Sequence, residues 1–112
     1  MQTERQKKIG RLLQKDIGEI ILELGRRNSE SALITVTKIQ VTSDLSIAKV
    51  YLSIYATVDK NKVLKNVQAQ AKEIRYILGG RIRHQLRIVP ELMFFEDDTL
   101  DYIENIDKLL KQ

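Results

Sequence analysis

The sequence predicts an α+β domain in which helices cover one face of a three-stranded sheet. Apolar residues recur at steps of three and four over residues 3–24 and again over 61–86, which is the period of a helix with one buried face. The segments 34–42, 48–55 and 87–95 are instead rich in β-branched residues or alternate between apolar and polar residues, as strands do. This order of helices and strands is typical of an α+β fold.

Composition and charge limit the class of protein. The 112 residues suit a single domain, 1–112, and the absence of cysteine excludes disulfides and thiolate metal sites. The N-terminus is charged and about 18 apolar residues never run together, so we expect a cytoplasmic protein without a membrane span. Residues 1–95 carry 17 basic and 9 acidic side chains, net +8, whereas 96–112 carry 2 and 6, net −4. A basic body indicates an anionic partner.

The ends and bends of several elements can also be predicted. Gly25 is expected to end the first helix. The apolar alternation of the first strand shifts phase after Val36, which predicts a bulge near Thr37–Lys38. Pro90 favours an edge position for the strand 87–95, because proline has no N–H to donate. A short acidic helix is expected over about 98–112.

The helical segment 61–86 carries the most informative charge pattern. Eight Lys or Arg lie from Lys60 to Arg87, against the single acid Glu73. Opposite the apolar stripe, one arc of the helix surface collects cations, an aromatic residue and a glycine: Lys65, Lys72, Arg75, Tyr76, Gly79 and Arg83. A glycine on such a face lets a partner's backbone come close, and phosphate is the group that suits the face best. The alternative is an ordinary solvated helix surface.

Candidates for catalysis or metal binding are weak. His84 is the only histidine, and it has no neighbour in the sequence that would form a triad or a metal cage. Glu96, Asp97, Asp98 and Asp101 offer oxygen ligands but lack the spacing and the turn glycine of a calcium loop. We therefore expect no enzyme activity, no cofactor and no metal.

Three segments resemble the bacterial ribosome-binding factor A family: DLSIAKVY at 44–51, IRYILG at 74–79 and RIVPELMFF at 87–95. They occur in the order and spacing of that family and, with the first helix, span nearly the whole chain. The resemblance implies a type II KH-like domain. It also implies a non-catalytic factor that binds the free small (30S) ribosomal subunit and assists late 16S rRNA maturation and 5′-end processing. Cells that lack such a factor are expected to grow slowly, and most slowly in the cold.

In that family a kink between two consecutive helices replaces the glycine-rich loop of ordinary KH domains. The kink is typically made by an alanine and a glycine one residue apart. The corresponding triplet here is Gln70-Ala71-Lys72, so Lys72 stands where the family has glycine.

The candidate RNA-binding residues are the cations of both helices and one glycine: Lys7, Lys8, Arg11, Lys65, Lys72, Arg75, Gly79, Arg81, Arg83 and Arg87. The expected partner is 16S rRNA within the small subunit, bound by a monomer, with no small-molecule substrate and no membrane. Because aromatic residues make up only 5% of the chain, we expect recognition of folded RNA by shape and backbone rather than by base stacking. A general RNA-binding or ribosomal-type structural protein is one alternative, and a protein-interaction domain that docks through its acidic C-terminal helix is another.

Overall fold

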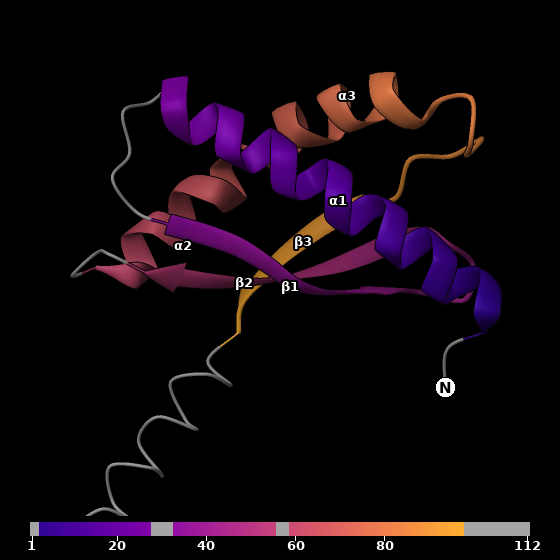
Figure 1. The fold of residues 1–112 in the computed structure, drawn as a ribbon, viewed down its shortest axis with the longest axis horizontal. Helices are drawn as coiled ribbons and strands as arrows, with labels where there is room; N and C mark the ends of the chain where they lie inside the picture. The colour runs from indigo at the N-terminus through magenta and orange to yellow at the C-terminus, as the bar shows by residue number, and fades with distance from the viewer. Residues whose placement is uncertain (1–2, 28–32, 56–58, 98–112) are drawn as a thin grey trace, which may run out of the picture.

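The structure, a computed structural model, describes residues 3–27, 33–55 and 59–97. Over these residues the predicted α+β fold, with helices on one face of a three-stranded sheet, is confirmed (Figure 1). The expected acidic helix at about 98–112 lies outside the described residues. The elements in chain order are α1 (Glu4–Arg27), β1 (Leu33–Val41), β2 (Ile47–Tyr55), α2 (Lys60–Ala69), α3 (Ala71–Ile82) and β3 (Glu91–Glu96).

The sheet has the order β1-β2-β3, with β1 antiparallel and β3 parallel to the central β2. The pairing of β1 with β2 shifts between Val36 and Lys38, which confirms the predicted bulge. As predicted, β3 is an edge strand. It begins at Glu91 rather than at Arg87, because the residues up to Pro90 form a separate loop whose last two carbonyls bond to a side chain of α3.

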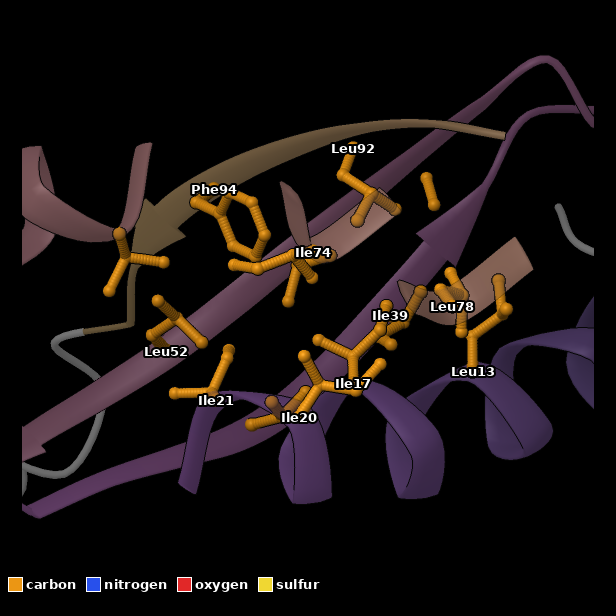
Figure 2. Close-up of a cluster of buried hydrophobic side chains, with 14 of the residues drawn as sticks. Leu13, Ile17, Ile20, Ile21, Ile39, Leu52, Ile74, Leu78, Leu92 and Phe94 are labelled. Carbon is orange, nitrogen blue, oxygen red and sulfur yellow. The ribbon is translucent and has the colours of Figure 1, made fainter. Parts of the chain in front are cut away.

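The hydrophobic core lies between the helices and the sheet (Figure 2). Leu13 and Ile17 of α1, Ile74 and Leu78 of α3, and Leu52 of β2 are buried in it almost completely. The apolar stripes read from the sequence therefore face inward. α1 lies along β1 and beside α3, so that α1 and α3 together form the outer layer (Figure 1).

Side-chain hydrogen bonds and packing set the two ends of α1. Thr3 Oγ1 accepts from the Gln6 N–H at 3.2 Å, and the Thr3 N–H donates to Gln6 Oε1 at 2.7 Å, which is a reciprocal capping box. At the other end, the prediction that Gly25 ends the helix is wrong, because α1 continues to Arg27. Leu24 is buried against the core, and this packing outweighs the local preference of glycine to stop a helix.

The segment predicted to be helical over 61–86 forms two helices separated at Gln70. α2 starts at the cap residue Asp59, whose carboxylate accepts from the Lys62 N–H at 3.0 Å. Gln70 has φ −94° and ψ 7°, which residues other than glycine can adopt, and α3 leaves it in a new direction (Figure 1). The chain thus bends next to Ala71 without the glycine expected from the family. α3 ends at Ile82, four residues before the predicted end at Leu86.

Candidate nucleic-acid interface

A hollow of about 700 Å³ lies on the outer side of α3. Seven of its lining residues come from α3 and its C-cap, and one comes from the loop before β3. They are Lys72, Arg75, Tyr76, Ile77, Gly79, Gly80, Arg83 and Val89. Five of the six residues that the sequence placed on one helix arc therefore line a single concavity. The sixth, Lys65, is exposed on α2 and is not among the residues that line it.

The hollow is positively charged. Lys72, Arg75 and Arg83 line it, and no acidic side chain is among its lining residues. Lys72 and Arg83 are exposed, and no ion pair with another described residue occupies either of them. A concave surface with one sign of charge concentrates the electrostatic field and favours anionic partners. The arrangement can thus hold phosphate groups without chemical reaction.

Arg75 has a second role, because it fixes the wall of the hollow. Its Nη2 donates to the Val89 carbonyl at 2.8 Å, and its Nε donates to the Pro90 carbonyl at 3.2 Å. A guanidinium has five N–H donors, so three remain for a ligand. Arg75 therefore ties the loop before β3 to α3 and still contributes its charge to the hollow.

The two consecutive glycines of α3 differ in their surroundings. A Cβ added at Gly79 would lie 3.3 Å from Val89 Cγ2, whereas a Cβ added at Gly80 would meet nothing within 4 Å. Gly79 thus lets Val89 pack closely against α3, and the glycine that is open to a partner is Gly80. Both glycines line the hollow, and the close approach of a partner's backbone at Gly79 stays a prediction.

Arg81 is engaged in the fold. Its Nη1 lies 2.6 Å from Glu19 Oε2 and 3.3 Å from Asp16 Oδ1, both on α1. The hydrogen bonds that Arg81 donates to Glu19, the larger cause, and to Asp16 raise the pKa of Arg81 above its ordinary value. Its charge is therefore largely compensated, and Arg81 joins α3 to α1 rather than facing the hollow.

The remaining predicted cations lie elsewhere on the surface. Lys7 and Lys8 are exposed near the start of α1, and Lys7 lies 3.9 Å from Glu4 in a solvent-exposed pair. Arg11 lines a different hollow, between α1 and β1. Arg87 lines a third, where the segment before β3 passes the start of α1. The structure therefore does not bring these four residues into the α3 hollow.

Sequence reasoning missed three residues that shape the hollow: Ile77, Gly80 and Val89. Gly80 follows Gly79 directly, and its position four residues after Tyr76 on a helix would have indicated that the two share a face. Val89 is ten residues from Gly79 in the chain, and its contact depends on how the loop folds back. No local sequence pattern predicts that contact.

Other kinds of site receive no support from the described parts of the chain. Over residues 3–27, 33–55 and 59–97, no three His, Cys, Asp or Glu side chains form a group that can hold a metal ion. Asp97 instead accepts a hydrogen bond from Thr37 Oγ1 at 2.6 Å, and His84 is exposed. No helix in the same ranges is long and apolar enough to cross a membrane.

Comparison with known proteins agrees with the sequence motifs. The family model for ribosome-binding factor A matches residues 5–110. A ribosome-binding factor A of Flavobacterium johnsoniae is 49% identical over 111 residues, which are 98% of this chain and 85% of that protein. One from Cytophaga hutchinsonii is 41% identical over 112 residues, 100% of this chain and 84% of that protein.

Solved structures share the fold. The crystal structure of ribosome-binding factor A from Thermus thermophilus superposes with a TM-score of 0.69 at 19% identity, covering 81% of this chain and 94% of that one. A Thermus thermophilus homology model fitted into the cryo-EM map of a 30S complex gives a TM-score of 0.66 at 22% identity, covering 79% of this chain and 90% of that one. At these identities the likeness shows the fold alone.

Proposed function

Because this chain belongs to the ribosome-binding factor A family, we propose that it binds the free small (30S) ribosomal subunit and assists late maturation of 16S rRNA. The observation that carries the proposal is the α3 hollow, with Lys72, Arg75 and Arg83 around it and no acid among its lining residues. The fitting of a relative into a 30S complex supports the choice of partner.

Phosphate contacts explain how such a surface binds rRNA. Each Lys or Arg that neutralises a phosphate releases condensed counterions, so affinity falls steeply as salt rises. These contacts position the protein on the RNA without reading its sequence. The exposed side chains of Lys72 and Arg83 supply the main contacts, and Arg75 adds charge from its braced position.

The protein acts, in this proposal, by differential binding rather than by catalysis. A binding protein shifts a conformational equilibrium only by the difference between its affinities for the two states. To assist maturation, including processing of the 16S rRNA 5′ end, it must bind immature subunits more tightly than mature ones. It works as a monomer in the cytoplasm and dissociates from the small subunit once the mature state forms.

The test is the ratio of dissociation constants for precursor and mature small subunits, measured at equal salt. We expect tighter binding to precursor subunits and steep salt dependence for both. A ratio near one would contradict the maturation role even if binding itself were strong.

Co-sedimentation separates this function from its alternatives. The proposed factor is recovered with purified free small subunits and much less with intact ribosomes. A ribosomal-type structural protein would be recovered with both, and a protein-interaction domain with neither. Recovery with both, or with neither, would therefore contradict the proposal.

A further inference from the structure

Tyr76 has an unusual place on the surface of α3. Its side chain is 84% exposed, more than any other large hydrophobic residue described. The other described tyrosines belong to the sheet, where Tyr51 stacks on Phe95 with ring centroids 5.5 Å apart. Tyr76 instead stands at the hollow, among cations. Its ring face is thus available to a partner.

The surface beside this ring is apolar and open. Ile77 and Val89 line the hollow, and a Cβ added at Gly80 would meet nothing within 4 Å beyond the adjoining backbone of its own helix. The volume of about 700 Å³ falls within the range of about 300–1,000 Å³ typical of small-ligand sites. A flat aromatic group fits here against the tyrosine ring, whereas a chain of phosphates alone would leave the apolar surface unused.

Cations stand on both sides of Tyr76 along one face of the helix. Lys72 precedes it by four residues, and Arg83 follows it by seven. At 1.5 Å rise per residue, they lie roughly 6 Å and 10 Å from Tyr76 along the helix axis. An anionic group on either side of a stacked ring can therefore be neutralised.

We propose that the α3 hollow binds one unpaired nucleotide of RNA, whose base stacks on Tyr76 while its flanking phosphates contact Lys72 and Arg83. Every base has a π-face, so such stacking tolerates any sequence, and proteins that recognise RNA commonly take up bases that are not paired. This inference rests on the proposed function and adds to it. Instead of recognising only the shape and backbone of folded RNA, the protein then also recognises a position in the RNA where a base is unpaired.

The absence of tryptophan from the chain allows a direct test. In Tyr76→Trp, the single indole lies at the proposed site, and its fluorescence reports stacking. A short unstructured oligoribonucleotide is expected to quench it, and a duplex of the same length is not. Tyr55→Trp, which places the indole on the sheet, is the matched control and is expected to respond to neither.

Affinity measurements with the full chain give the second arm. Tyr76→Phe keeps the stacking surface and is expected to bind the single strand as the natural protein does. Tyr76→Leu keeps apolar bulk without a ring and is expected to weaken binding to the single strand roughly five- to hundredfold, with little change for the duplex. Circular dichroism checks that each variant is folded, which the high exposure of Tyr76 favours.

The outcomes separate the two proposals. In one outcome, the double variant Lys72→Glu with Arg83→Glu binds both RNAs more weakly, whereas Tyr76→Leu binds normally and the fluorescence of Tyr76→Trp is not quenched. The nucleotide site is then wrong, and the basic interface stands. If that charge reversal also leaves binding to RNA and to small subunits unchanged, both proposals fail. Loss of single-strand affinity in Tyr76→Leu together with quenching in Tyr76→Trp supports the nucleotide site.

Discussion

Asp44 organises the turn between β1 and β2. Its Oδ1 accepts from Thr42 Oγ1 at 2.7 Å, from Ser46 Oγ at 2.7 Å and from the Ser46 N–H at 3.1 Å. The same turn holds Leu45 at φ 62°, which a residue other than glycine adopts only at a cost of about 1 kcal/mol. In return, the half-buried Leu45 packs against the core.

These donors predict a pH effect on stability. They lower the pKa of Asp44, with the Thr42 hydroxyl as the largest cause, to about 2 from 3.8. Because the folded-state pKa lies below the unfolded one, the carboxylate stabilises the fold fully above about pH 4, and this contribution is lost as the pH falls to about 2. We expect Asp44→Asn to unfold more easily than the natural protein at pH 5. The difference in free energy of unfolding, measured by urea denaturation, should shrink as the pH falls toward 2 and vanish below it. A difference that does not change with pH would contradict this assignment.

Two helical glycines predict opposite effects of the same substitution. A Cβ at Gly10 would lie 3.2 Å from the Ile39 carbonyl oxygen, which is fixed in β1, whereas Gly80 faces open space. We expect Gly80→Ala to raise the free energy of unfolding by about 0.5–1 kcal/mol, because alanine is the better helix former. Gly10→Ala should lower it by about 1 kcal/mol or more, because α1 must move off the sheet. Chemical denaturation checks both, and stabilisation by Gly10→Ala would show that α1 does not approach β1 this closely.

At the scale of elements, Arg81 connects the two outer helices. We expect Arg81→Gln to lower the free energy of unfolding by roughly 0.5–1 kcal/mol, because it removes the partly exposed ion pairs with Asp16 and Glu19. Its affinity for small subunits should change little. The matched variant Lys72→Gln should do the reverse, with unchanged stability and weaker binding. Denaturation and binding measured on both variants decide this, and equal affinity losses would place Arg81 in the interface.

The sequence predicts which elements form better than where they end. Periodicity identified the buried faces, because burial against the core imposes it on every turn or pleat. The break at Gln70 lies where the family resemblance places a kink, whereas the late start of β3 goes with tertiary contacts of the loop before it. Arg75, for example, donates hydrogen bonds to carbonyls fourteen and fifteen residues away in the chain, and no local pattern predicts such a contact.

At the scale of the whole molecule, the candidate site was partly predictable. The helical arc correctly joined Lys72, Arg75, Tyr76 and Arg83, since all four lie on one element whose period is known. The wider list of candidate RNA-binding residues also included Arg81, which pairs with Asp16 and Glu19 in the structure, because a sequence does not show which charges find partners within the fold. The hollow itself was not predicted, because it forms only where the loop before β3 folds back and places Val89 beside α3.

The most direct test of the α3 interface is the affinity for free small ribosomal subunits after a matched pair of charge reversals, measured across a range of salt. One double variant is Lys72→Glu with Arg83→Glu, at the hollow. The other is Lys49→Glu with Lys62→Glu, which makes the same change in charge at exposed positions of β2 and α2. We predict that the hollow variant loses more than about tenfold in affinity. The slope of the logarithm of its association constant against the logarithm of salt concentration should become less steep by about two. The affinity and the slope of the other variant should stay close to those of the natural protein. Equal losses in both folded variants, or unchanged binding by the hollow variant, would contradict the account.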